Sequence, residues 1–264
     1  MGKTVILVWM FFCLGQSMEV MGGQGGEDVN EVLCQGESRS HIQGVDADDS
    51  GIYWSFATDL FKTDWDGRVL AHQSVPNHHG DCCLREGKLY VSVAWFTPEG
   101  KLPYLFVYDS RDLKLLEKIR VDAIPTGFDG ITWKDGFFYL TEGKGSPDVK
   151  TPGNWLHQMT EDFQWVKKYY IPGETIYGIQ AMTYAHGNFW LGTYGKLGTI
   201  QTDSTLQTIA HHPLGVAVGI FGLPASPEGH PRFMVAEVVR KENGLQTARL
   251  RCVVFQNGKL TWQY

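Results

Sequence analysis

Two histidines, an aspartate and two adjacent cysteines lie within one short stretch of the chain, residues 77–93 (NHHGDCCLREGKLYVSV). Imidazole and carboxylate groups can exchange protons with a substrate or bind a metal ion, and thiols bind metals or form disulfides. The second half of the stretch alternates apolar and polar residues, as a β-strand does. The stretch is therefore either a chemical cluster or the polar start of a repeated structural element, and its recurrence in the chain distinguishes the two.

The same pattern recurs five times. Each copy has a variable residue, a small residue, a short apolar run, a turn with glycine, and a second run that carries a large apolar side chain. The copies are 43–56 (QGVDADDSGIYWSF), 79–93 (HGDCCLREGKLYVSV), 129–142 (DGITWKDGFFYLTE), 180–193 (QAMTYAHGNFWLGT) and the most degenerate, 221–237 (FGLPASPEGHPRFMVAE). Two more strand-like runs joined by a polar turn follow each copy, so each unit contains four strands.

Five units of this length predict an all-β fold, a five-bladed β-propeller with four antiparallel strands per blade. The chain resembles β-propeller proteins over residues 41–264, through this blade pattern alone. It lacks the WD dipeptide, the kelch double glycine and the Asp-box pattern, so the resemblance indicates no specific family. Secreted five-bladed propellers include sugar-cleaving enzymes, nucleotidases, glutaminyl cyclases and lectins, and the resemblance implies a function of this range.

Composition agrees with a β-rich domain, since the 264 residues include 31 glycines and 13% aromatic residues. The formal net charge is -6 and the basic residues are scattered, so we expect no nucleic-acid partner. Residues 1–17 have the basic start and short apolar run of a secretory signal peptide, with a lipid anchor at Cys13 as the alternative. We expect a flexible linker over 18–30, one domain over 31–264, no transmembrane segment, a monomer, and a secreted or periplasmic location.

In a propeller the first strands line the central channel, and their equivalent ends face the same mouth. The alignment predicts a ring of side chains at that mouth, with a second set two positions earlier. The ring is Gln43, His79, Asp129, Gln180 and Phe221, and the earlier set is His41, Asn77, Gly127, Gly178 and Gly219. His78 is expected to point away from the channel. The ring differs from blade to blade, which favours one asymmetric small ligand, although polar channel residues also simply bind water.

The second strands contribute two carboxylates, Glu142 and Glu237, within otherwise apolar runs. Glu142 lies in the same unit as Asp129, so the two are predicted to approach each other. A pair of carboxylates near a histidine is the minimum equipment for general acid and base catalysis. We therefore predict Asp129, Glu142, His79 and His41 as catalytic residues, and Gln43, Gln180, Tyr194 and Glu237 as ligand-binding residues.

Aromatic residues near loops offer rings that can stack on a sugar face, with core packing as the alternative. They are Trp95, Trp155 and Tyr194. Asp46, Asp48 and Asp49 are interpreted as turn acids.

A divalent metal ion is possible as a cofactor. His41, His79 and Asp129 suit a transition metal, and Asp129, Glu142 and Glu237 suit calcium, although no contiguous metal motif is present. A disulfide between Cys34 and Cys252 would join the two ends of the ring, and two buried thiols are the alternative. For the adjacent pair Cys82 and Cys83, two independent buried thiols are favoured over a vicinal disulfide.

From these features we predict an exported propeller that binds a small polar molecule, such as a carbohydrate, in its channel. Acid/base or metal-assisted hydrolase or lyase activity is one hypothesis. The alternative is a non-catalytic propeller that binds a ligand or a partner protein. The difference between blades in the channel favours the enzyme, and the absence of a specific catalytic motif favours the alternative.

Overall fold

The computed structural model describes residues 29–76, 78–97, 100–144 and 152–263. Within these ranges it describes every side chain except those of residues 95–97, 100 and 101. The predicted signal peptide, most of the predicted linker, Asn77 and the side chain of Trp95 lie outside the described residues. The described residues contain no helix that is long and apolar enough to cross a membrane.

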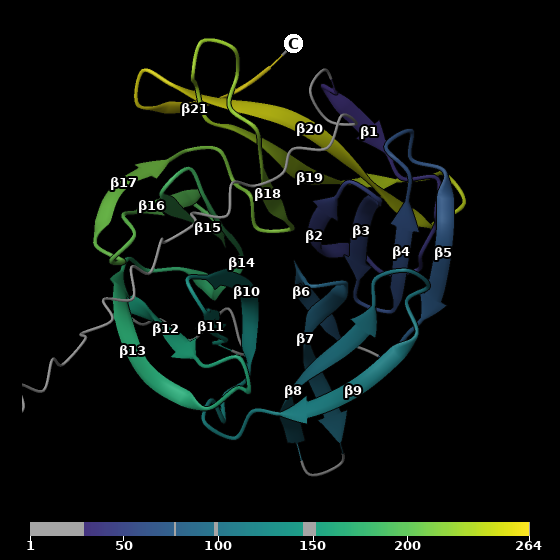
Figure 1. Cartoon of the computed structure of the whole chain (residues 1–264), viewed down its shortest axis with the longest axis horizontal. Coiled ribbons are helices and arrows are strands. Elements are labelled where there is room, and N and C mark those ends of the chain that lie inside the picture. The colour runs from purple at the N-terminus through teal and green to yellow at the C-terminus, as the bar shows by residue number, and fades with distance from the viewer. Residues whose placement is uncertain (1–28, 77, 98–99, 145–151, 264) are drawn as a thin grey trace, which may run out of the picture.

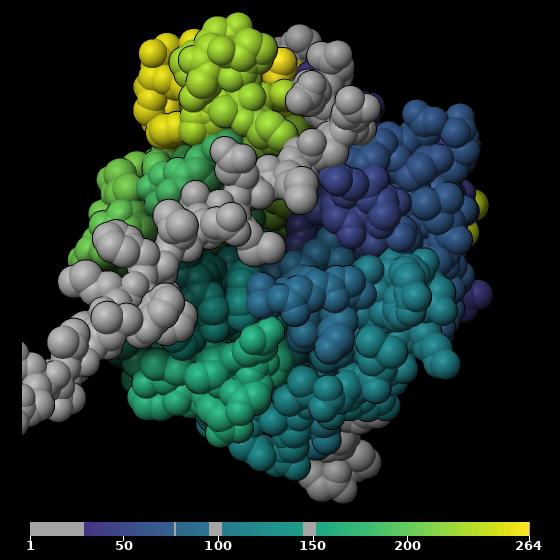
Figure 2. Space-filling view, viewed as in Figure 1, coloured from purple at the N-terminus to yellow at the C-terminus, as the bar shows by residue number. Residues whose placement is uncertain are grey.

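The chain forms a five-bladed β-propeller, which confirms the predicted fold class. Blades one to four are antiparallel sheets of four strands in sequence order, and blade five has four such strands and one more from the N-terminus. The five sheets follow one another around a common axis in the order of the chain (Figures 1 and 2). The first strands lie innermost: β2 (Ile42–Asp48), β6 (His79–Arg85), β10 (Phe128–Lys134), β14 (Ile176–Ala185) and β18 (Ile220–Leu223).

The remaining strands of each blade lie progressively farther from the axis. The second strands are β3 (Gly51–Phe56), β7 (Lys88–Thr97), β11 (Phe137–Glu142), β15 (Asn188–Tyr194) and β19 (Arg232–Arg240). The third strands are β4 (Asp59–Thr63), β8 (Gly100–Asp109), β12 (Gly153–Met159), β16 (Thr199–Thr202) and β20 (Gln246–Gln256). The fourth strands are β5 (Val69–Ser74), β9 (Leu115–Arg120), β13 (Trp165–Pro172), β17 (Thr208–His212) and β21 (Lys259–Trp262).

The core lies between the faces of neighbouring blades, because a sheet with two apolar faces must bury both. One cluster, for example, combines Tyr53 and Leu60 of blade one with Cys82, Val91 and Phe106 of blade two. The alternating pattern of the second and third strands supplies these side chains, and the fourth strands are mostly exposed.

A short N-terminal strand closes the ring, which the repeat count did not require. Strand β1 (Glu31–Leu33) pairs antiparallel with β20, so Val32 lies opposite Leu250. Strand β1 pairs with residues 249–251 of β20, and strand β21 pairs with residues 253–256 along the same edge. The outermost position of blade five is therefore shared by strands from both ends of the chain. Val32 is 3% exposed and packs in the core, whereas Leu33 is 47% exposed. Non-covalent strand exchange thus performs the role that the sequence analysis gave to a disulfide.

The cysteines are buried free thiols in the described structure: Cys34, Cys82, Cys83 and Cys252. The predicted disulfide between Cys34 and Cys252 is therefore wrong, and the alternative of two buried thiols is confirmed, as it is for Cys82 and Cys83. Cys252 instead donates a hydrogen bond to the Gln263 side chain across 3.1 Å. Burial raises the pKa of Cys34 to about 11, so the thiol stays protonated and unreactive.

The first strands of blades one to four each contain a β-bulge, where one extra residue interrupts the pairing with the second strand. The interruptions lie between Ile42 and Gly44, His79 and Cys82, Phe128 and Ile131, and Ile179 and Ala181. On the near side of the bulge, His79 pairs with Val93 just as Ile42 pairs with Phe56. His79 is therefore equivalent to Ile42, and His78 is equivalent to His41.

The predicted alignment of blade two is thus displaced by one residue. It matched Gly80 to Gly44 and Gly130, but Asp81 occupies that position in the structure. Backbone hydrogen bonds confirm the corrected register, because His41 and His78 accept from Ala57 and Ala94 at equivalent places.

Candidate functional site

The corrected register reverses the predicted roles of the two adjacent histidines. His79 is fully buried, and its Nε2 lies 2.7 Å from the Tyr108 hydroxyl while its Nδ1 lies 2.8 Å from the Pro76 carbonyl oxygen. Its ring also packs edge-on against Phe106. Burial lowers the pKa of His79 to about 4, so it is a neutral core residue between blades one and two. The prediction that His79 faces the channel is wrong.

His78 takes the predicted place beside Gln43 and His41. The Gln43 side-chain amide donates to Nε2 of His41 across 2.9 Å and to Nε2 of His78 across 2.8 Å. Burial, together with the positive charge of Arg240, lowers the pKa of His41. Blades one and two therefore contribute an amide held between two imidazole rings.

Blades three and four contribute a second polar pair. The Gln180 side-chain amide donates to Oδ2 of Asp129 across 2.9 Å. A Cβ atom on Gly143 would lie only 2.8 Å from the same Oδ2, so a side chain there would displace the Asp129 carboxylate. Burial and the negative charge of Asp129 raise the pKa of Tyr194, which is consistent with its lying close to Asp129. The structure thus brings together Asp129 and Gln180, as the predicted ring required, and Tyr194 lies close enough to feel the charge of Asp129.

Phe221 and Glu237, which were predicted to lie near these polar residues, make other contacts in blade five. Blade five has no bulge, and Phe221 is 4% exposed in the core, where it meets Trp65 edge-on at 6.4 Å between ring centres. Glu237 lies opposite Arg249 on β20, and its carboxylate oxygens lie 3.5 Å from Arg249 and 3.7 Å from Arg251. These contacts give Glu237 a structural ion-pair role on blade five.

Glu142 and Asp129 take different partners, because the Glu142 side chain turns toward the third strand of its own blade. Its Oε1 accepts a hydrogen bond from the Thr126 hydroxyl across 3.0 Å, and its Oε2 lies 3.1 Å from Nε2 of His157 on β12. Nδ1 of the same ring accepts the indole N–H of Trp165 across 3.3 Å. Because an indole nitrogen only donates, the neutral His157 ring carries its proton on Nε2 and donates it to Glu142.

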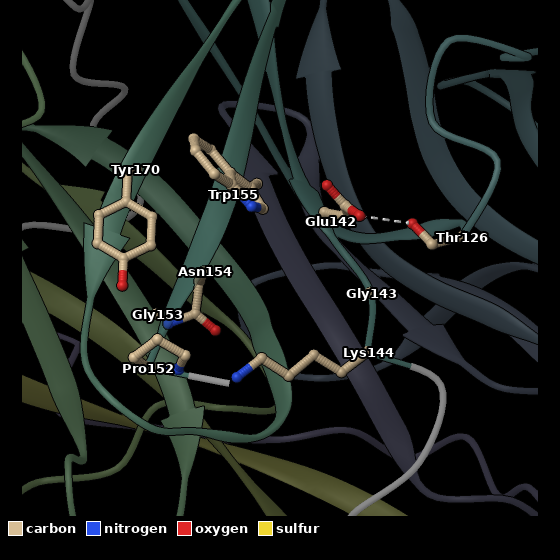
Figure 3. Close-up of a pocket in the computed structure, with 9 residues that line it drawn as sticks. All are labelled: Thr126, Glu142, Gly143, Lys144, Pro152, Gly153, Asn154, Trp155 and Tyr170. Carbon is tan, nitrogen blue, oxygen red and sulfur yellow. Dashed lines mark hydrogen bonds between the residues drawn. The ribbon is translucent and has the colours of Figure 1, made fainter. Parts of the chain in front are cut away.

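A cavity of about 440 Å³ lies beside this carboxylate (Figure 3). Its lining combines one carboxylate, one ammonium, two exposed aromatic rings and small backbone segments. The lining residues are Thr126, Glu142, Gly143, Lys144, Pro152, Gly153, Asn154, Trp155 and Tyr170. Trp155 is 37% exposed and Tyr170 is 46% exposed, and their ring centres are 5.1 Å apart with the planes tilted by 63°.

Both ends of Asn154 are already used within the protein. Its Oδ1 accepts from the Thr175 hydroxyl across 2.6 Å, and its Nδ2 donates to the Gly173 carbonyl across 3.0 Å. It therefore fixes the wall that carries Trp155. His157, Lys144, Asn154 and Tyr170 belong to no recognisable motif and were not predicted as site residues.

A second cavity, of about 580 Å³, lies at the C-terminal ends of the first strands, opposite the ends that carry Gln43 and Asp129. Asp46, Cys83, Trp133, His186 and Phe221 are among its lining residues. Asp46 was interpreted as a turn acid, but it lies on β2 and accepts a hydrogen bond from the backbone N–H of Leu84 across 2.7 Å. Burial raises the pKa of Asp46 to about 7.

Asp81 is a buried residue of the first strand of blade two, β6. One of its carboxyl oxygens, Oδ2, accepts backbone hydrogen bonds from Ile131 across 3.2 Å and from Met182 across 2.9 Å. The first strands of blades two, three and four are thereby linked through one side chain, which also lies against Gly44 of blade one. Burial raises the pKa of Asp81 well above its ordinary value.

Neither predicted set of metal ligands is assembled. Within the described ranges, no group of three or more His, Cys, Asp or Glu side chains is arranged to hold a metal ion.

No protein-family model matches the chain, and no curated protein matches it. Solved structures share its fold at low sequence identity. A glutaminyl cyclase from Myxococcus xanthus is 12% identical with a TM-score of 0.53, over 85% of this chain and 96% of that chain. A GH43_1 enzyme from Xanthomonas citri, solved with xylose, is 11% identical with a TM-score of 0.57, over 85% of this chain and 90% of that one. A Bacteroides caccae protein of unknown function is 14% identical with a TM-score of 0.50, over 87% and 82%. These similarities establish the propeller fold.

Proposed function

We propose that this protein is an exported β-propeller that binds a carbohydrate in the cavity beside Glu142, and that Glu142 acts there as a general base. The observation that carries the proposal is the chain of hydrogen bonds from Trp165 through His157 to Glu142, which ends at the cavity wall. Export is supported by the signal-like residues 1–17.

The hydrogen bonds leave Glu142 suited to accept a proton from a ligand. Two donors, Thr126 and His157, hold the two carboxylate oxygens in fixed directions. A carboxylate that accepts two hydrogen bonds is oriented before the ligand arrives, so the transfer needs little reorganisation. The neutral His157 ring stabilises the resting carboxylate through the hydrogen bond that its Nε2 donates.

The aromatic rings give the cavity the character of a sugar site. A sugar ring has faces of C–H groups and an edge of hydroxyl groups, so sugar sites combine aromatic walls with hydrogen-bonding side chains. Trp155 and Tyr170 provide the wall, and Glu142 and Lys144 provide the polar groups. The similarity in fold to a GH43_1 enzyme solved with xylose supports a carbohydrate ligand, and the similarity to a glutaminyl cyclase supports an enzymatic role for a propeller of this shape.

The test separates binding from catalysis. Xylose, glucose and short oligosaccharides are titrated calorimetrically into the wild-type protein, Trp155→Ala and Glu142→Gln, with Glu117→Gln on the exposed strand β9 as the matched control. We expect Trp155→Ala to weaken binding about tenfold or more. We expect Glu142→Gln to retain binding and to lose the release of sugar products that the wild type and Glu117→Gln show.

Binding by the wild type without any turnover would refute the general base and support the non-catalytic alternative. Binding that is unchanged in Trp155→Ala would refute the cavity as the site.

A further inference from the structure

Lys144 is the group in the cavity whose chemistry the proposed function does not use. Its Nζ is shielded from solvent and has no hydrogen-bond partner among the described residues. Its backbone N–H donates to the Tyr177 carbonyl across 3.2 Å, which joins the end of blade three to the first strand of blade four. The residue is therefore fixed at its backbone while its charged end remains unpaired.

The side chain of Lys144 extends along the cavity toward Pro152 and Asn154, away from the Glu142 carboxylate (Figure 3). Asn154 does not neutralise the ammonium, because its oxygen and nitrogen are bonded to Thr175 and Gly173. The negative charge of Glu174 attracts Lys144 from a distance, yet burial outweighs it and lowers the pKa of Lys144.

A shielded ammonium without a partner is energetically unfavourable, and an anion that enters the cavity would relieve this cost once the flexible side chain turns Nζ toward it. An anionic group is also attracted more strongly there than at an exposed lysine, because the surroundings screen the charge less. Glu142 repels the same group, so the ligand must place its negative charge at the Lys144 end of the cavity. The two residues together therefore select both the charge and the orientation of the ligand.

On this basis we propose that the ligand is an acidic sugar, one that carries a carboxylate or a phosphate at the edge of its ring, and that Lys144 binds this group. The inference rests on the proposed function, since it names the class of carbohydrate that the same cavity takes. The neutral ring of the ligand lies against Trp155 and Tyr170, and its hydroxyl groups face Glu142.

Three probes of similar ring shape test the inference: glucose, glucuronate and glucose 6-phosphate. Each is titrated into the wild type, Lys144→Met, Lys144→Arg and Lys167→Met, the last being an exposed lysine of β13 as the matched control. We expect the wild type to bind at least one of the two anionic sugars about tenfold or more tightly than glucose. Lys144→Met loses this preference, Lys144→Arg retains part of it, and Lys167→Met retains it in full.

The two anionic probes identify which group is recognised, because a preference for glucuronate indicates a carboxylate and a preference for glucose 6-phosphate indicates a phosphate. A second readout uses the native residue, whose pKa rises when the anion binds and can be followed through the Lys144 Cε resonance by NMR. This readout keeps the inference testable if Lys144→Met fails to fold.

Equal affinity for glucose and both anionic sugars, or a preference that survives in Lys144→Met, would overturn the inference while leaving the proposed carbohydrate site standing. Failure of all three sugars and of neutral oligosaccharides to bind would overturn the proposed function itself.

Discussion

His157 and Glu142 are joined by a hydrogen bond of 3.1 Å in which the imidazole donates to the carboxylate. Trp165 fixes the direction of this bond, because its indole N–H occupies the other ring nitrogen. In Glu142→Leu the carboxylate acceptor is lost while the indole of Trp165 still donates to Nδ1, so we expect the neutral His157 ring to keep its Nε2–H tautomer. Two-bond ¹H–¹⁵N correlation spectra of the imidazole measure the tautomer directly. A mixture of tautomers in Glu142→Leu would show that Trp165 does not orient the ring.

Asp81 is expected to hold the first strands together through one oxygen. Asp81→Ala leaves the backbone N–H groups of Ile131 and Met182 buried without partners, and we expect a loss of about 3 kcal/mol in the free energy of unfolding. Asp81→Asn keeps an acceptor of the same shape, so its loss should stay below about 1 kcal/mol. Denaturant unfolding measures both. Equal losses of unfolding free energy in Asp81→Ala and Asp81→Asn would show that the hydrogen bonds to the Asp81 carboxylate do not stabilise the fold.

Strand β1 offers a matched pair of adjacent residues for testing closure of the ring. Val32→Asp places a charge in the core beside Leu250, and we expect a loss of about 3 kcal/mol or more. Leu33→Asp places the same charge on an exposed face of the same strand and should change stability by less than about 1 kcal/mol. Thermal unfolding followed by circular dichroism compares them, and a similar loss in both would show that the pairing of β1 does not stabilise the ring.

Asp46 predicts a pH dependence of stability. Its pKa in the folded protein is raised from 3.8 to about 7 by burial, so the folded state holds the proton more tightly than the unfolded state does. The contribution of Asp46 is therefore fully present below pH 3.8 and is lost as the pH rises toward 7, by at most about 4 kcal/mol.

Asp46→Asn removes this loss, so its stability relative to the wild type should increase between pH 4 and pH 7. The opposite effect of His79, whose folded pKa is lowered to about 4, is common to both proteins and cancels in the comparison. A difference between the two proteins that does not vary with pH would contradict the assignment.

The sequence predicted the propeller because the repeat is a property of local patterning. Alternating runs and glycine turns recur in every blade, and they determine which residues pair within it. The predicted alignment of the repeats was wrong where one extra residue interrupts a strand. The bulge beside His79 has no signature in the residue types, and the glycine at position 80 suggested an alignment that the backbone pairing does not follow.

The site was predicted in part for a related reason. Asp129 and Gln180 were predicted to lie together because both lie at the same end of their first strands, which the repeat defines. His157 and Lys144 were missed because the contact of His157 with Glu142 and the place of Lys144 in the cavity each depend on the direction of a single side chain. Ring closure by β1 was missed because a strand of three residues carries too little pattern to be recognised.

The most direct test of the account is a crystal structure of the protein soaked with xylose and, separately, with glucuronate. We predict electron density for the sugar in the cavity lined by Glu142, Lys144 and Trp155, with the carboxylate of glucuronate at Nζ of Lys144. Density only in the opposite cavity, beside Asp46 and Trp133, or no sugar density at saturating concentration, would contradict the proposed site.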